Sequence, residues 1–245
     1  MKFIYGKHAI EELLKKFPNL ALKLYYTRRE KLEELNLKDL KIEKFEINSE
    51  SLRRKFNLKE FESPQGLLLE LKEDINNYLK TSPEELILNA CETNKNLILI
   101  TNINDNHNLG AIARSCAVFN NVAGIIYSIE SPARLIPSTA KISAGGIFHL
   151  KFAEFKNLKN LIKAINSSGM EILCFENRQE SVPLKLWKEQ NKEKSPYIFI
   201  FGAEDIGIPR EIQQTKHQSI KIEQNSNFDS LNLSVATGIT LYEFL

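Results

Sequence analysis

The sequence predicts an α/β fold, in which a small N-terminal α/β unit precedes a larger domain built around a parallel sheet. Continuous apolar runs such as Leu97–Ile100 and Tyr197–Phe201 are typical of strands that are buried on both faces of such a sheet. Segments with apolar residues at helical spacing separate these runs, as the crossover connections between parallel strands require. Residues 1–75 alternate shorter strand-like and helix-like segments, which indicates a separate small domain.

The N-terminal domain is predicted to begin with an amphipathic helix, Tyr5–Phe17. Its apolar residues fall on one helical face and its charged residues on the other, and Pro18 ends it. Strands are predicted at Leu22–Tyr26, Ile42–Ile47 and Gly66–Leu71, and helices at Arg29–Leu35 and Ser49–Phe56.

Residues 76–95 are predicted to link the two domains, because this segment is polar and Thr81-Ser82-Pro83 interrupts it. A short helix, Glu84–Cys91, leads into the larger domain, residues 96–245. Six strands are predicted there, at Leu97–Ile100, Val122–Tyr127, Ile147–Phe152, Glu171–Phe175, Tyr197–Phe201 and Ser219–Ile222. Helices are predicted at 109–119, at Leu158–Asn166 and at the end of the chain.

The bulk composition is that of a globular protein of 245 residues, with 42% hydrophobic and 26% charged residues. No apolar run is long enough to span a membrane, and the N-terminus lacks the apolar core of a secretion signal, so we expect a cytoplasmic protein. The three cysteines lie apart in apolar segments, which favours reduced core thiols and predicts no metal site. The net charge of +2 is too small to indicate a nucleic-acid partner by itself.

Candidate ligand-binding residues follow two strands of the larger domain. Ligands of parallel sheets bind beyond the carboxyl ends of the strands, where these residues are expected. Gly202-Ala203-Glu204 follows one strand, where Gly202 permits close backbone approach and Glu204 offers a carboxylate. Ser230-Leu231-Asn232 comes after the other strand. A plain turn at residues 202–204, and a helix cap at Asp229 or Ser230, would explain the same residues.

The helix predicted at 109–119 has a buried apolar stripe, and Arg114 lies opposite that stripe. Small residues surround Arg114 on the helix, which leaves room for a ligand or another chain. A solvated arginine is the ordinary alternative, and Asn108, directly before the helix, could serve only as its N-cap.

The last helix is apolar nearly all round, which suggests burial in an oligomer interface. The chain has no GxGxxG after the first strand of the larger domain and no GxxxxGK[ST] or GxSxG. A nucleotide-like cofactor would therefore be held mainly by backbone groups of loops.

Three segments together resemble the three motifs of the SpoU (TrmH-like) family of SPOUT RNA ribose 2′-O-methyltransferases. They are Asn108-Leu109-Gly110-Ala111-Ile112-Ala113-Arg114, Phe201-Gly202-Ala203-Glu204 with Gly207, and Ser230-Leu231-Asn232-Leu233-Ser234-Val235-Ala236. Ser143-Ala144-Gly145 fits the same pattern. Near the N-terminus, Tyr5-Gly6-Lys7-His8-Ala9 and Gln65-Gly66 are similar to the substrate-recruiting domain of bacterial 23S rRNA guanosine 2′-O-methyltransferases.

The resemblance implies a trefoil knot in the C-terminal domain, an S-adenosylmethionine cofactor, an RNA substrate, a homodimer and a ribosomal-protein-like RNA-binding domain at the N-terminus. By family likeness Gly202, Ile222 and Leu231 contact the cofactor, largely through backbone groups. The catalytic positions of the family correspond here to Asn108, Arg114, Glu204, Ser230 and Asn232.

The sequence departs from the family pattern around the expected cofactor loops. Thr101 and Asn106 replace an Asp and a Pro of the first motif, Asp205 stands where Gly is common, and Glu223, Gln224 and Ser226 replace a Pro-Met-x-Gly run. These departures leave the polar catalytic positions intact.

The expected reaction is in-line attack of a ribose 2′-hydroxyl on the methyl group of the sulfonium. A guanidinium is a poor proton acceptor near neutral pH, so our hypothesis is that Arg114 grips a phosphate beside the target ribose. Two alternatives stay open: a tRNA ribose 2′-O-methyltransferase, and a non-catalytic RNA-binding or ribosome-assembly factor with the same fold.

Overall fold

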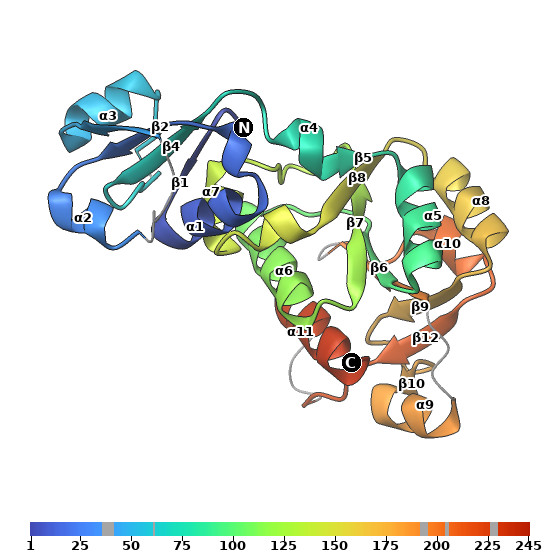
Figure 1. Ribbon diagram of the computed structural model, residues 1–245. Coiled ribbons are helices and arrows are strands. Elements are labelled where there is room, and N and C mark those ends of the chain that lie inside the picture. Colours follow the sequence, from blue (N-terminus) through green and yellow to red (C-terminus); the bar gives the residue numbers. More distant parts are fainter. Residues whose placement is uncertain (36–41, 61, 192–195, 204–205, 226–229) are drawn as a thin grey trace.

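A computed structural model describes residues 1–35, 42–60, 62–191, 196–203, 206–225 and 230–245 of the chain. The described residues form a four-stranded sheet near the N-terminus and an eight-stranded sheet that occupies the larger part of the molecule (Figure 1).

The smaller sheet has the strand order β1-β4-β2-β3, in which β4 is antiparallel to both of its neighbours and β2 and β3 are parallel. Its elements are β1 (Phe3–Tyr5), α1 (Lys7–Lys16), the 3₁₀ turn η1 (Pro18–Leu20), β2 (Ala21–Tyr26), α2 (Arg29–Glu33), β3 (Glu43–Glu46), α3 (Ser49–Lys55) and β4 (Leu67–Leu71). Alternate residues of β4 face opposite sides, since Leu69 packs in the core that contains α1 and Leu68 packs with Leu52 of α3.

Strand β1 is absent from the sequence-based prediction, which wrongly started the first helix at Tyr5. Gly6 has φ of +91°, so the chain turns there and the helix begins at Lys7. The three residues before this turn pair with Leu68–Glu70 of β4. A strand of three residues is too short to show a period of its own, and its pairing with a distant strand decides its structure.

The segment predicted as a linker contains α4 (Asn76–Leu79), β5 (Lys80–Thr81) and α5 (Pro83–Thr93). Helix α5 begins with a capping box, in which Ser82 accepts a hydrogen bond from the Glu85 backbone and the Glu85 side chain accepts one from Ser82. Strand β5 pairs with β8 and forms one edge of the larger sheet. The division of the chain at residues 75 and 95 stays a prediction.

The larger sheet is parallel in every described pairing and has the order β10-β12-β9-β11-β6-β7-β8-β5. Besides β5, its strands are β6 (Asn96–Ile100), β7 (Val122–Ser128), β8 (Lys151–Phe155), β9 (Glu171–Phe175), β10 (Val182–Pro183), β11 (Tyr197–Phe201) and β12 (Gln218–Lys221). The predicted α/β class with a parallel sheet is therefore confirmed.

Helices cover both faces of this sheet (Figure 1). They are α5, α6 (Asn106–Phe119), α7 (Pro137–Ile142), the 3₁₀ turn η2 (Gly146–His149), α8 (Leu158–Ser168), α9 (Leu184–Gln190), α10 (Arg210–Gln213) and α11 (Leu233–Glu243). Leu97 and Leu99 of β6 pack with α5, α8 and α10, whereas Ile98 and Ile100 face the core that contains α6 and α11. Two-sided burial explains the continuous apolar run of this strand.

The strand predicted at Ile147–Phe152 is wrong in its position, because the chain forms η2 there and β8 begins only at Lys151. Ala144 and Gly145 have φ of +51° and +85°, and these left-handed residues turn the chain into η2. Short elements such as α7, β10 and α9 are also absent from the sequence-based prediction.

The cysteines are free thiols, as predicted: Cys116 and Cys174 are buried and Cys91 is half-buried. Burial raises the pKa of the Cys174 thiol to about 12 and also raises the pKa of Cys116. Among the described helices, none has the length and apolar composition that a membrane crossing needs.

Candidate active site

A cavity of about 320 Å³ lies beyond the carboxyl ends of β9 and β11, against the start of α11. A second cavity of about 100 Å³ adjoins it and shares much of its lining. Gly202 lines the larger cavity, Ile222 lines the smaller one, and Ser230 and Leu231 line both. The structure thus brings together four of the residues singled out in the sequence, at the edge of the sheet where ligands of parallel sheets bind.

Gly202 is glycine because of a close backbone approach. A Cβ atom at this position would lie 2.3 Å from the Gly207 carbonyl carbon and 2.6 Å from the Ile208 nitrogen. The chain returns to this point through two backbone hydrogen bonds between Ala203 and Gly207, of 3.1 and 2.9 Å. Residues 202, 203 and 207 therefore form one fixed wall of the cavity. Glu204 and Asp205, which the sequence analysis also named, lie outside the described residues.

Glu176, which follows β9 directly, is a cavity residue that the sequence analysis missed. Its side chain is only 9% exposed, and its Oε1 accepts a hydrogen bond of 2.8 Å from the Ser219 hydroxyl. The Arg178 guanidinium lies 2.9 Å from Oε2 and balances the charge. The rule that pointed to Gly202, polar residues directly after a buried strand, applies equally to Glu176 and could have found it.

Asn108 and Asn232 connect the two helices beside the cavity, since the Asn232 amide donates a hydrogen bond of 3.0 Å to Asn108 Oδ1. Neither predicted cap is right. Helix α6 begins at Asn106 with Asp105 as its N-cap, so Asn108 lies in the first turn. Helix α11 is capped by Asn232, whose Oδ1 accepts a hydrogen bond from the Ser234 backbone, and not by Ser230. Asp229, the other predicted cap, lies outside the described residues.

Arg114 is exposed on α6, as predicted, but within one chain it lines two other cavities and not the cavity of Gly202 and Leu231. One of these measures about 700 Å³ and lies against α1, and the other measures about 320 Å³ and also contains Glu12. Among the described residues, no cluster of His, Cys, Asp and Glu has the arrangement of a metal site.

Solved structures share the fold of this protein. The AdoMet-bound rRNA methyltransferase from Sinorhizobium meliloti superposes with a TM-score of 0.70, over 99% of this chain and 85% of that one, at 19% sequence identity. At this identity the likeness shows the fold alone, an α/β fold with a parallel sheet.

The sequence identifies the family within that class. Residues 95–242 match the SpoU rRNA Methylase family, and the chain belongs to it. The 23S rRNA (guanosine-2′-O-)-methyltransferase RlmB of Blochmanniella floridana is 28% identical over 250 residues, which cover 99% of this chain and 93% of that protein. An uncharacterized tRNA/rRNA methyltransferase of Archaeoglobus fulgidus is 30% identical over 168 residues, 67% of this chain and 70% of that protein.

Proposed function

We propose that the protein transfers a methyl group from S-adenosylmethionine to the ribose 2′-hydroxyl of a guanosine in 23S rRNA. The observation that carries the substrate assignment is the extent of the match to the Blochmanniella enzyme. That match covers 99% of this chain, and therefore includes the N-terminal sheet as well as the family segment at residues 95–242.

The cavity at the ends of β9 and β11 has the composition that an adenosine cofactor needs. Apolar side chains such as Ile222 and Leu231 suit the adenine ring, and the volume of about 320 Å³ is at the lower end of that of ligand pockets. Gly202, Ile222 and Leu231 would hold the cofactor largely through their backbone groups. When bound, S-adenosylmethionine supplies a methyl group activated by its sulfonium.

Glu176 would accept hydrogen bonds from the ribose hydroxyls of the cofactor. A carboxylate after a parallel strand suits a ribose diol because its two oxygens only accept hydrogen bonds. Ser219 and Arg178 hold this carboxylate in place. We expect Glu176→Ala to weaken S-adenosylmethionine binding at least tenfold in calorimetric titration, since hydrogen bonds to a charged group contribute about 1.5–3 kcal/mol. Unchanged affinity would remove Glu176 from the site.

The remaining tasks fall to polar residues of the three family motifs. We assign Asn108, Ser230 and Asn232 to positioning the target ribose, and Glu204 to orienting Arg114 or binding the ribose. Arg114 would hold a phosphate next to that ribose through two parallel hydrogen bonds, and the hydroxyl proton would leave to water. Arg114 is not the base in this scheme, because a guanidinium stays protonated near neutral pH.

A homodimer would complete this site. Exposed apolar side chains gather on α6 and α11, among them Val118, Val235 and Tyr242, which are 71%, 48% and 64% exposed. The two helices lie side by side (Figure 1). Arg114 lies one turn before Val118 on α6, so a dimer formed through this face would place Arg114 at the interface. The guanidinium could then reach the partner subunit's cofactor cavity.

Three further features belong to the proposal: a trefoil knot in the C-terminal part of the chain, RNA binding by the N-terminal domain, and a cytoplasmic location. The knot and the RNA-binding domain are supported by membership of the family, together with the full-length match to an rRNA enzyme. The cytoplasmic location follows from the proposed ribosomal RNA substrate.

The test is mass-spectrometric mapping of ribose methylation in 23S rRNA from cells with the wild-type gene, without it, and with Arg114→Ala. One 2′-O-methylguanosine should be present only with the wild type. If the lost mark is instead in tRNA, and purified protein methylates tRNA and not 23S rRNA, the protein is a tRNA methyltransferase. If no mark is lost and calorimetry detects no S-adenosylmethionine binding, it is a non-catalytic RNA-binding factor.

A further inference from the structure

The largest of the cavities described above lies where the N-terminal sheet meets α6 and α7, and we call it the junction cavity. It measures about 700 Å³, and its lining includes Gly6, Lys7, Lys31, Gln65, Arg114 and Lys141. Residues 6–8 and Gln65 come from the N-terminal segments that the sequence analysis singled out, and the proposed methyl transfer does not use them. We propose that the junction cavity binds the sugar–phosphate backbone of the substrate RNA next to the target nucleotide.

The charge of the junction cavity fits a polyanion. Among the described residues that line it, four carry cationic side chains and Glu34 is the only one with a carboxylate. That carboxylate is already paired, because Lys31 Nζ lies 2.6 Å from its Oε1. Lys141 donates one ammonium proton to the Ser63 carbonyl at 2.9 Å, and an ammonium carries three. The cations come from α1, α2, α6 and α7, so they surround the cavity and do not form a single point of charge.

Several residues around the junction cavity have a backbone conformation with positive φ. Ten described residues have positive φ, and five of these line or adjoin this cavity: Gly6, Gln65, Gly66, Ala144 and Gly145. For Gln65 and Ala144, which carry a Cβ, a left-handed conformation costs about 1–2 kcal/mol each. Strained backbone of this kind gathers at ligand sites and persists only where the surrounding packing holds it.

Packing between the two parts of the chain holds the junction cavity in one shape. A Cβ at Gly145 would lie 2.5 Å from Glu12 Cβ, so α1 contacts the turn before η2 without room for a side chain. Glu12 also pairs with His149 at 2.8 Å across the same contact. A preformed site loses little conformational entropy when it binds a ligand.

RNA fits this site better than a small anion does. Cations on four different helices match the repeated charges of a nucleic-acid strand, and a cavity of this volume accommodates a nucleotide unit. Arg114 belongs to the same lining, and in the proposed function it grips the phosphate beside the target ribose. The inference rests on that proposed function, and it extends the RNA contact from Arg114 to Lys141 and Lys7.

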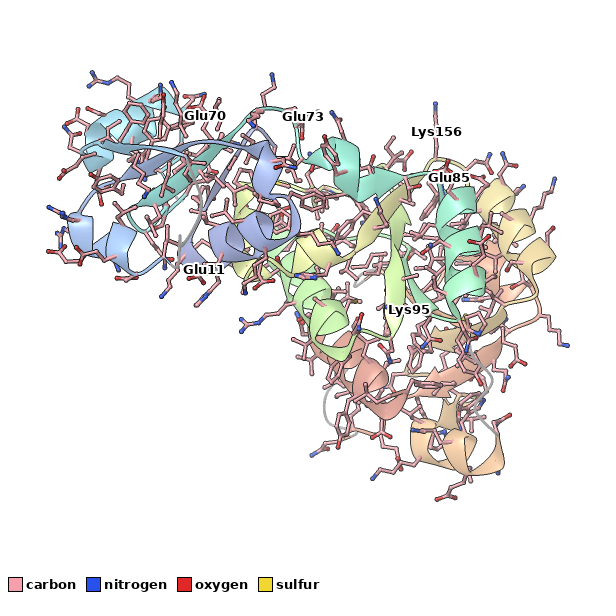
Figure 2. All side chains as sticks on the ribbon, viewed as in Figure 1. Glu11, Glu70, Glu73, Glu85, Lys95 and Lys156 are labelled. Carbon is pink, nitrogen blue, oxygen red and sulfur yellow. The ribbon has the colours of Figure 1, made fainter. Side chains whose placement is uncertain are left out.

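The test compares the affinity of the dimer for a 23S rRNA transcript at several salt concentrations. Affinity falls as salt rises, and each lost phosphate contact makes the slope of log affinity against log salt less steep by about 0.7–0.9. We expect Lys7→Gln and Lys141→Gln each to make the slope less steep by this amount, and the double variant to make it less steep by about twice as much. Lys7→Arg should keep the wild-type slope. Lys156→Gln is the matched control, since Lys156 projects from the loop before α8, far from α1 (Figure 2).

A wild-type slope in the double variant would overturn the inference, provided that thermal unfolding shows the variant to be folded. Saturation of the site by inorganic phosphate at concentrations that leave RNA binding unchanged would overturn it too. The binding assay needs no S-adenosylmethionine, so its outcome is separate from that of methylation. A protein that shows these slopes but methylates nothing would lose the proposed function and keep the RNA site.

Discussion

Replacing Gly202 by alanine tests whether the cavity wall formed by residues 202, 203 and 207 binds the cofactor. The new Cβ would lie 2.3 Å from the Gly207 carbonyl carbon and 2.6 Å from the Ile208 nitrogen, both of them backbone atoms. If the wall keeps its position, overpacking costs about 1–3 kcal/mol. If it moves, the two hydrogen bonds between Ala203 and Gly207 break, at about 1 kcal/mol each. Overpacking and the loss of the two hydrogen bonds thus each cost about 2 kcal/mol of free energy.

We expect the wall to shift in the free variant, because the atoms that meet the new Cβ are backbone atoms. The cofactor can then bind only if the wall returns to its original position, so this cost appears in cofactor affinity. A loss of about 2 kcal/mol of binding free energy corresponds to a roughly thirtyfold larger dissociation constant for S-adenosylmethionine in calorimetric titration. Gly169→Ala is the matched control: Gly169 ends α8 with φ of +75°, and its Cβ would meet nothing within 4 Å. That change should lower stability by about 1 kcal/mol and leave cofactor affinity unchanged. Wild-type affinity in Gly202→Ala would refute the assignment.

Three further predictions concern other parts of the molecule. Asn232→Asp keeps the oxygen that caps α11 but replaces the donor to Asn108 by an acceptor, so urea unfolding should show a loss of about 1 kcal/mol. Iodoacetamide near pH 8 should label Cys91 first, because burial raises the pKa of the two other thiols. The hydrogen bond from Lys15 lowers the pKa of Glu12 below its ordinary value of 4.5. The ionised Glu12 therefore stabilises the fold above that value, and the contribution is lost as pH falls through the lower folded-state pKa.

Each of these expectations has an outcome that contradicts it. Equal stability of wild type and Asn232→Asp would mean that the two asparagines do not interact in solution. Labelling of all three cysteines at one rate in the native protein would contradict the burial of the two core thiols. The stability difference between wild type and Glu12→Gln should shrink between about pH 5 and pH 3 in urea unfolding, and a constant difference would contradict the pairing of Glu12.

The predictions from sequence that were right rest on local pattern. Burial on both faces makes Leu97–Ile100 and Tyr197–Phe201 continuously apolar, and such runs need no knowledge of their partners. Sequence also indicated the sheet edge that carries Gly202 and Leu231, because strands in parallel sheets end in small or polar residues where ligands bind. Arg114 was placed correctly on the exposed face of its helix by spacing alone.

Helix starts were less predictable, because several residues in a row can act as caps. Asp105 and Asn108 are both good N-cap residues, and so are Ser230 and Asn232. Close to Asp105, the Ile103 backbone nitrogen donates to Ser131 Oγ, a contact between residues 28 positions apart. Contacts with distant residues therefore decide where each helix begins, and the residue at that point becomes the N-cap: Asp105 in α6 and Asn232 in α11.

The amino-acid sequence by itself determined the class of fold, the parallel sheet and the family, and it singled out Gly202, Ser230 and Leu231, which line the cavity beyond β9 and β11. Each of these depends on residue spacing or on contiguous motifs. Only the tertiary structure decided that Glu176 is held by Ser219, that Arg114 lines other cavities of its own chain than the one beyond β9 and β11, and that residues 6, 65, 114 and 141 line one cavity. These relations join residues that are tens of positions apart. Chain packing sets such distances, and no local periodicity encodes them.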